Sequence, residues 1–174
     1  MIEQKNVVGI DLSKDDFQVQ FITGNQERSV IKGTRKFTND YNGFVLFLEW
    51  TQAKSKGTAV HFVMESTGVY YENLAYFLHE NQCLVSVVLA SKIKYFAKSL
   101  NVKTKTDKVD ARLIALFGMQ HTPQAWKPIS KELKRLRTLC REIISCNKEV
   151  TRLKNQLHAL KRAKYTQESI LALK

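Results

Sequence analysis

The order of apolar segments along the chain is the feature that most constrains its fold. From about residue 39, segments with helical spacing alternate with short apolar runs that favour buried strands. The helical segments are 39–56, 69–81, 92–100 and 107–119, and the apolar runs are 59–64 and 84–89. Asn39 is the expected N-cap of the first helix. Because an alternation of strand and helix is typical of strands paired in parallel, this part is predicted to form an α/β sheet with right-handed crossovers.

Three segments with strand character precede this alternation. They are residues 7–10, 16–23 and 27–34. Turn residues at 11–15 and 24–26 connect them, so we expect an antiparallel meander that opens with a hairpin. The two patterns together predict a mixed sheet flanked by helices. In that sheet the first and fourth strands lie side by side, and the late helix crosses them.

A long amphipathic segment begins near Ser130. Its apolar residues recur at steps of three and four, the spacing of a coiled coil. They are Leu133, Leu136, Cys140, Ile143, Val150, Leu153, Leu157 and Leu160. Asn147 interrupts this row, and the step from Val150 to Leu153 shortens it. Since one helix cannot bury such a row alone, it needs a partner helix, either from a second copy of the chain or from downstream sequence. We therefore predict two domains, 1–126 and 127–174, and a homo-oligomer formed through the C-terminal helix.

The basic charge of the chain is concentrated in this C-terminal arm. The formal net charge is +12, yet residues 1–126 contain 15 Lys and Arg against 12 Asp and Glu. Residues 127–174 contain 13 against 4. Basic surfaces bind polyphosphate backbones through the release of counterions, so the imbalance favours a nucleic-acid partner. A solvated helix face is the alternative interpretation.

Several classes of protein are excluded by composition. No apolar run approaches the length of a membrane-spanning helix, and residues 1–5 lack a signal-peptide pattern. The three cysteines, Cys83, Cys140 and Cys146, are too scattered for a disulfide framework. The four histidines show no zinc-like spacing. We therefore expect an intracellular protein without a membrane partner.

Four acidic residues lie at the ends or edges of predicted elements. Asp11 follows the run 7–10, and Glu65 follows an apolar strand. Asp107 and Asp110 stand three apart at a predicted helix start, and therefore share one face of that helix. Mg²⁺ is held by a few carboxylates together with waters and substrate phosphates. The four acids thus predict a single divalent-metal site, and phosphoryl transfer on nucleic acid is the natural function for it.

Each acid also has a purely structural interpretation. Asp11 can open the hairpin turn, and Glu65 can be an edge residue that reaches solvent. Asp107 can be a helix N-cap, with Asp110 stabilising the same helix through its dipole. The joint interpretation is favoured because the predicted sheet brings the four positions together, and α/β sheets gather their ligands at the carboxyl ends of parallel strands.

Three motifs together resemble the N-terminal domain of the DEDD transposases, the insertion-sequence-one-ten family that is similar to the Piv DNA invertase. They are Val-Gly-Ile-Asp-Leu-Ser-Lys at 8–14, Met-Glu-Ser-Thr-Gly at 64–68 and Lys-Thr-Asp-Lys-Val-Asp-Ala at 105–111. Any one of them is a weak signal. All three occur in the order of the family, and the resemblance covers essentially the whole chain.

The resemblance implies a ribonuclease-H-like fold, similar to that of the Holliday-junction resolvase RuvC, followed by a basic coiled-coil helix. The family's catalytic, metal-binding tetrad falls on Asp11, Glu65, Asp107 and Asp110. Mg²⁺ is the implied cofactor, with Mn²⁺ as a substitute. DNA is the implied substrate, cut and joined during insertion-sequence transposition under the guidance of a structured RNA from the element. The protein would act in the bacterial cytoplasm, at the nucleoid.

One departure from the family concerns its C-terminal part. Family members carry a second domain with a serine assigned to covalent attack on DNA, and the chain stops at Lys174 before such a domain. Ser130, Ser145 and Ser169 match no part of that motif. We therefore expect a fragment that binds metal and nucleic acid without completing recombination alone.

Residues near the acids are expected to contact nucleic acid. Phosphates would be clamped by Lys103, Lys105, Lys108 and Arg112. The backbone or the scissile phosphate would be contacted by Ser13, Thr67 and Tyr70. Tyr95 and Trp126 either stack on bases or pack in the core.

Two other functions remain open. In a non-catalytic nucleic-acid-binding and dimerisation module, the acids would only orient a metal or a phosphate, and Asp11→Asn would leave function intact. An actin-like or sugar-kinase-like ATPase fragment also begins with Gly-Ile-Asp and a hairpin. That fold requires Gly-rich phosphate loops, and the sequence has no convincing one.

Overall fold

The computed structural model describes residues 4–66, 68–102 and 106–163. The chain divides into two compact units, residues 1–127 and 128–174. The predicted site residues Thr67, Lys103 and Lys105 lie outside the described residues.

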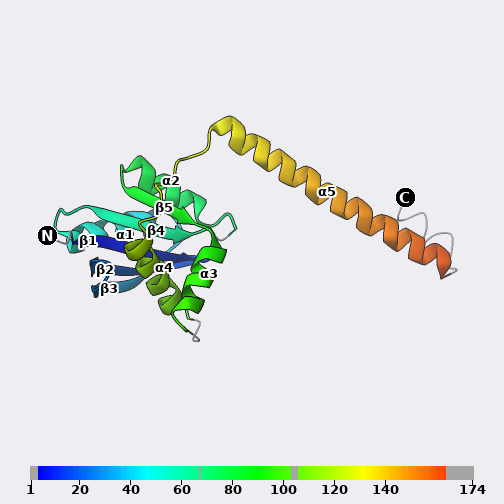
Figure 1. The fold of residues 1–174 in the computed structure, drawn as a ribbon. Helices are drawn as coiled ribbons and strands as arrows, with labels where there is room; N and C mark the ends of the chain where they lie inside the picture. Colours follow the sequence, from blue (N-terminus) through cyan, green and yellow to red (C-terminus); the bar gives the residue numbers. More distant parts are fainter. Residues whose placement is uncertain (1–3, 67, 103–105, 164–174) are drawn as a thin grey trace. The chain divides into compact units, whose positions relative to one another are not determined.

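A five-stranded mixed sheet forms the centre of the first unit (Figure 1). Its strands are β1 (Lys5–Leu12), β2 (Asp16–Gly24), β3 (Ser29–Thr38), β4 (Val60–Glu65) and β5 (Leu84–Val88). Their spatial order is β3-β2-β1-β4-β5. β1, β2 and β3 pair antiparallel, whereas β4 is parallel to β1 and β5 is parallel to β4. The predicted mixed sheet is confirmed, including the first strand beside the fourth.

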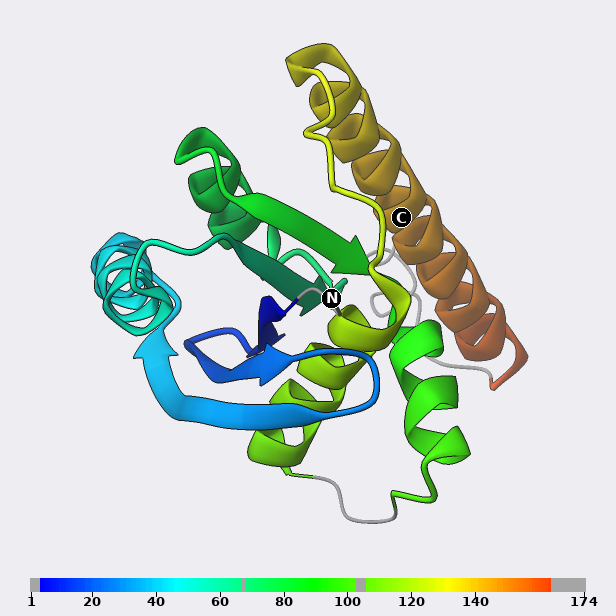
Figure 2. The ribbon, with the colours of Figure 1, turned by 60° about the vertical axis from the view of Figure 1, so that its left-hand side comes forward.

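Helices cover both faces of this sheet. They are α1 (Tyr41–Ser55), α2 (Glu72–Glu80), α3 (Ala90–Ser99) and α4 (Asp107–His121). One core cluster joins Phe17 of β2 to Phe47 of α1 and also includes α2. The second cluster, on the opposite face, joins Val63 of β4 to Ile93 of α3 and Ile114 of α4. Figure 2 shows α3 and α4 together on one side of the sheet, with α1 on the other.

The N-cap of α1 differs from the sequence prediction. Asp40 Oδ1 accepts a hydrogen bond from Gly43 N–H at 2.7 Å, so Asp40 is the cap and Asn39 is not. Asn39 Nδ2 instead donates to the carbonyl oxygen of Ser13 at 2.9 Å. Both side chains are suited to capping, and the longer-range bond to the β1–β2 turn decides between them.

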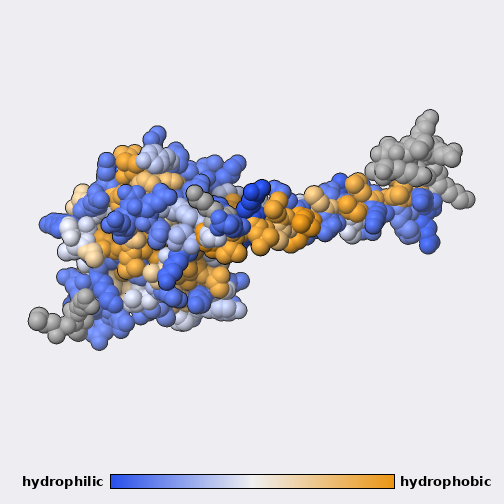
Figure 3. Space-filling view, turned by 90° about the horizontal axis from the view of Figure 1, so that it is seen from above, coloured by the Kyte–Doolittle hydropathy of each residue, from blue (hydrophilic) through white to orange (hydrophobic). Residues whose placement is uncertain are grey.

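The second unit contains α5 (Lys131–Arg162), a helix of 32 residues. Several of its large apolar side chains are exposed, among them Ile143 at 60% and Val150 at 47% (Figure 3). A regular heptad row runs through Leu136, Leu139, Ile143, Cys146, Val150, Leu153, Leu157 and Leu160. This row is more regular than the predicted one, because Leu139 and Cys146 take the places given to Cys140 and Asn147. Among the described residues, no helix combines the length and apolar character needed to cross a bilayer.

Candidate metal and nucleic-acid site

Gly9 on the central strand lets α4 pack directly on the sheet. A Cβ added at Gly9 would stand 2.2 Å from the carbonyl oxygen of Ala111 and 2.2 Å from the amide nitrogen of Ala115. Further along the helix, a Cβ on Gly118 would stand 2.9 Å from Cγ1 of Val7. Because Gly118 lies over Val7 and Ala111 over Gly9, α4 runs antiparallel to β1. The late helix thus crosses the sheet as predicted.

The contact between Gly9 and α4 determines where three of the acids lie along β1 and α4. Asp11 lies two residues beyond Gly9 on the same face of β1, which is about 7 Å further along the strand. Asp107 and Asp110 lie six and three residues before Leu113, the centre of the Gly9 contact on α4. These separations are about 9 and 4.5 Å along the helix axis, so the two acids lie on either side of the level of Asp11. Asp11 therefore stands opposite the first turn of α4.

A row of polar side chains crosses the sheet at this level. Asp11 pairs with Gln18 of β2, and Gln18 pairs with Lys36 of β3. On the other side of β1, the parallel register with β4 brings Glu65 beside Asp11, at the usual strand spacing of about 5 Å. Since Asp11 belongs to the paired part of β1, the interpretation that it opens the hairpin turn is wrong.

The first turn of α4 carries the other two acids. Thr106 Oγ1 accepts a hydrogen bond from Val109 N–H at 3.3 Å, so Thr106 is the N-cap and the interpretation of Asp107 as the cap is wrong. Asp107 precedes the buried Ala111 by four residues, and therefore lies on the same side of α4, the side that faces the sheet. Asp110 is half-buried, as are Asp11 and Glu65, whereas Asp107 is exposed. Both helix acids also stabilise the helix through its dipole.

Glu65 and Asp110 line one pocket between α3 and α4. Its volume is about 600 Å³, and Lys94 and Lys98 of α3 line it as well. Apart from Ser91, the other described residues that line it are apolar. The pocket thus combines two carboxylates suited to a hard cation with two ammonium groups suited to phosphate oxygens.

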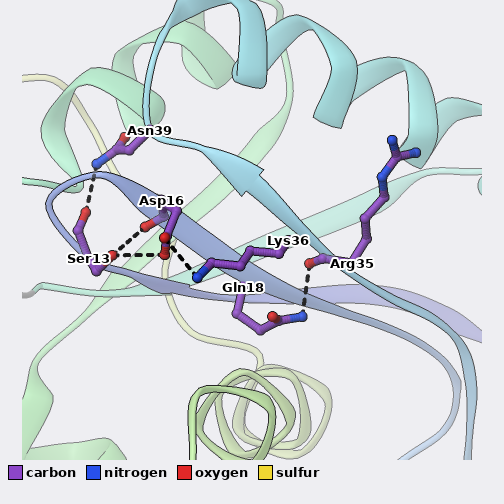
Figure 4. Close-up of polar contacts among 6 residues, drawn as sticks. All are labelled: Ser13, Asp16, Gln18, Arg35, Lys36 and Asn39. Carbon is purple, nitrogen blue, oxygen red and sulfur yellow. Dashed lines mark hydrogen bonds and ion pairs between the residues drawn. The ribbon is translucent and has the colours of Figure 1, made fainter.

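A hydrogen-bonded group from the β1–β2 turn, β2 and β3 adjoins this row (Figure 4). Lys36 Nζ lies 2.7 Å from Asp16 Oδ2, and the Ser13 hydroxyl lies 3.0 Å from Asp16 Oδ1. The hydrogen bond from Lys36 lowers the pKa of Asp16, and the same bond raises the pKa of Lys36. The negative charge of Asp107 adds to the raised pKa of Lys36, so Asp107 lies within electrostatic reach of β3.

The four acids offer the oxygen ligands that Mg²⁺ prefers. Within the described residues, no group of three or more His, Cys, Asp or Glu side chains is arranged to hold a metal ion. Mg²⁺ is usually bound by only one or two carboxylates when waters and substrate phosphates complete its shell. Glu65 and Asp110 in one pocket meet that requirement, and assignment of all four acids as ligands stays a prediction.

The predicted nucleic-acid contacts are placed unevenly. Lys108 and Arg112 are exposed one turn apart on α4 and share a face of that helix. The Ser13 hydroxyl donates within the β1–β2 turn, 2.8 Å from the carbonyl oxygen of Asp16. Tyr70 is 42% exposed, and its carbonyl oxygen accepts a hydrogen bond from Asn39 at 3.3 Å. Contact of these residues with nucleic acid stays a prediction.

Sequence reasoning left four polar neighbours of the acids out of the site. Gln18 and Lys36 enter it through strand pairing, which periodicity does not specify. Lys94 and Lys98 enter it because one face of α3 lines the pocket. A signal for α3 was available, since residues 90–99 contain three lysines and no acidic residue.

Comparison with known proteins extends this description. A family model for DEDD transposases of the insertion sequence IS110, described as "Transposase", matches residues 8–163. The pilin gene-inverting proteins of Moraxella lacunata and Moraxella bovis are 37% and 36% identical to the chain over 139 residues. The match covers 79% of this chain and 42% of each relative, so the chain spans less than half the length of these relatives.

Among solved structures, two of RuvC from Thermus thermophilus are similar to this chain. One is RuvC in complex with a Holliday junction substrate, with a TM-score of 0.48 and 11% identity. It covers 68% of this chain and 94% of the RuvC chain. The other is RuvC, with a TM-score of 0.49 and 12% identity, covering 70% and 99%. The family match includes all four acids, nearly all of the first unit and most of the second, and the chain therefore belongs to the IS110 family of DEDD transposases.

Proposed function

We propose that the chain carries a divalent-metal site for the cleavage and transfer of DNA strands. The proposed ligands are Asp11, Glu65, Asp107 and Asp110. The observation that carries the proposal is the pocket in which Glu65 and Asp110 share a cavity with Lys94 and Lys98. Membership of a transposase family supports DNA as the substrate and transposition as the process.

The chain's own residues would bind and orient the DNA phosphate. Mg²⁺, or Mn²⁺ in its place, would supply Lewis-acid chemistry at this site. Asp11, on the central strand, would hold the metal together with Glu65, Asp107 and Asp110. Lys94 and Lys98 would hold phosphate oxygens by charge-assisted hydrogen bonds. The apolar remainder of the pocket strengthens these interactions by excluding water.

Calorimetric titration of the chain with Mg²⁺ and Mn²⁺ tests this site. We expect Asp11→Asn and Glu65→Gln to lose metal binding, because each removes a charged ligand without changing side-chain size. Asp15→Asn is the matched control, since Asp15 is an exposed acid in the β1–β2 turn. Metal binding that persists in both site variants would contradict the proposal and favour the non-catalytic binding module.

Thermal unfolding gives a second readout that does not depend on catalysis. An ion that binds only the folded state at ten times its dissociation constant stabilises it by about 1.4 kcal/mol. Asp11→Asn should lose this stabilisation. Without metal, the same variant should be more stable than the wild type, because it removes one of several clustered negative charges. A variant less stable than wild type without metal would mean that Asp11 has a structural role instead.

The exposed row on α5 supports a second proposal, the pairing of two copies of the chain. In the heptad, Ile143 and Val150 occupy the position called a, and Leu139 and Leu153 occupy the position called d. β-branched residues at a with Leu at d favour two parallel strands. Cys146, also at d, would then face Cys146 of the second copy.

The resemblance implies a structured guide RNA as a further partner, and the basic charge of the C-terminal arm supports it. If the arm binds RNA, the affinity should fall steeply with added salt.

A further inference from the structure

A second cavity lies along α3, and its lining differs from that of the carboxylate pocket. Its volume is about 870 Å³, and it lies between α3, the end of β5, the end of α4 and residues 123–127. We call it the aromatic groove. The residues that matter are Lys92, Tyr95, Phe96, His121, Trp126 and Lys127. No Asp or Glu is among the described residues that line it.

The rings of the groove are held in place by their neighbours. His121 stacks on Phe117 with ring centroids 4.4 Å apart and an interplanar angle of 11°. Phe96 meets His121 edge-on at 5.3 Å. Tyr95 remains 68% exposed, with Lys98 Nζ 5.7 Å from its ring centroid. The groove therefore offers an exposed ring beside a packed aromatic wall.

Trp126 is fixed by the edge strand. Its backbone N–H donates to the carbonyl oxygen of Val85 at 2.7 Å. Its ring packs edge-on against Tyr76 and His79 of α2 and against the core cluster that includes α1 and α2. Just before it, the carbonyl oxygens of Pro123 and Gln124 each lie 2.9 Å from the Ser86 hydroxyl. The segment is thus docked on β5, and it places Trp126 beside the groove with its ring held by α2.

We infer that the aromatic groove binds an unstacked base of a single-stranded nucleic acid. Aromatic rings provide stacking surfaces for bases, and nearby Lys92 and Lys127 provide contacts for the flanking phosphates. The volume lies within the range of pockets that enclose small ligands. α3 separates the groove from the carboxylate pocket, whose lysines continue the cationic surface across the same helix. This inference goes beyond the proposed metal site, because it assigns a base-binding site that uses none of the four acids.

Quenching of Trp126 fluorescence tests the inference. The 174-residue chain is titrated with oligo(dT), oligo(rU) and an abasic oligonucleotide of equal length and charge. Oligo(dT) or oligo(rU) should quench the emission, and the abasic strand should not, because only a base that enters the groove and stacks on Tyr95 comes close to Trp126. Whichever of oligo(dT) and oligo(rU) binds more strongly identifies DNA or RNA as the ligand of the groove. The chain has two tryptophans, so quenching should disappear in Trp126→Phe, where Trp50 remains.

Two exposed tyrosines provide a matched pair of variants. Tyr95→Ala should weaken binding of the base-bearing strand by about 5- to 150-fold, the usual loss for one stacked base. Tyr41→Ala should leave binding unchanged, since Tyr41 is 70% exposed on α1, on the opposite face of the sheet. Equal quenching by the abasic strand, unchanged affinity in Tyr95→Ala, or no quenching by either base-bearing strand would overturn the inference.

The result can be separated from the test of the metal site. Asp11→Asn should keep the quenching by oligo(dT) or oligo(rU), because Asp11 does not line the groove. Tyr95→Ala should keep Mg²⁺ binding, because Tyr95 does not line the carboxylate pocket. Loss of quenching in Asp11→Asn with the fold intact would overturn the assignment of an independent base site.

Discussion

Substitution of Gly9 by Ala tests the contact that positions the candidate site. The added methyl carbon would stand 2.2 Å from backbone atoms of Ala111 and Ala115, whereas real Cβ contacts essentially never fall below 3.0 Å. Because backbone atoms cannot rotate away, α4 must move outward by most of an ångström. A gap of that size costs the facing atoms about a quarter to a half of their dispersion energy.

The expected cost follows from this displacement. Overpacking of a core usually costs about 1–3 kcal/mol of stability. We expect Gly9→Ala to cost about 3 kcal/mol, because a whole helix must shift. For a domain of this size, that loss lowers the melting temperature by roughly 10 °C. The outward shift also moves Asp107 and Asp110 away from Asp11, so metal binding should weaken even in the folded molecules.

Two other glycines complete the experiment. Gly57→Ala is the control, since nothing lies within 4 Å of its added Cβ. Its positive φ of 80° limits the expected cost to about 1–2 kcal/mol. Gly118→Ala should fall between, because its Cβ would meet the side chain of Val63 at 2.6 Å, and a side chain can adjust. Urea unfolding followed by circular dichroism measures all three. A Gly9→Ala variant no less stable than Gly57→Ala would refute the reasoning.

Three further outcomes follow from the contacts. Burial lowers the pKa of His61 below 6.5. The stability it contributes is therefore full above pH 6.5 and is lost as the pH falls through the folded-state pKa, so His61→Gln should flatten unfolding curves measured across that window. The lowered pKa of Asp16 changes stability in the same direction, so stability is lost as the pH falls below about 3.8. Lys36→Met should shift that loss to higher pH in acid titrations, because it removes the hydrogen bond that lowers the pKa. Mild oxidation should link two chains through Cys146, as non-reducing electrophoresis would show. Cys146→Ser should abolish the link and Cys140→Ser should retain it.

Periodicity predicted the sheet because each strand carries its own apolar pattern. The run 7–10 and the alternation of 16–23 specify buried strands locally, and the α/β alternation specifies the parallel pairs. β3 was predicted to end near residue 34 and continues to Thr38. Phe37 is buried there against Phe17 with ring centroids 5.6 Å apart, a tertiary contact that local spacing does not contain.

The acids themselves were recognisable in the sequence, but their surroundings were not. The motifs around Asp11 and Glu65 identify residue types and order, whereas Lys36 approaches Asp107 only through the pairing of β2 with β3 and the docking of α4. Thr106 outcompetes Asp107 as the cap because its hydroxyl reaches Val109 N–H. Cap choice depends on backbone angles at the helix start, and two neighbouring residues that both suit the position cannot be ranked by type alone.

The polar row across the sheet explains how the chain can carry clustered acids and still fold. Carboxylates held close together raise each other's free energy in the ionised state, which opposes folding when no cation is bound. Lys36 lies at the end of the row and within electrostatic reach of Asp107, and its ion pair with Asp16 holds it on β3. Its positive charge offsets part of the repulsion without entering the carboxylate pocket. Removal of Lys36 should therefore make the folded chain more dependent on Mg²⁺, so that Lys36→Met gains more thermal stability from added Mg²⁺ than the wild type does. Equal gains in the two proteins would show that Lys36 serves the β-hairpin alone.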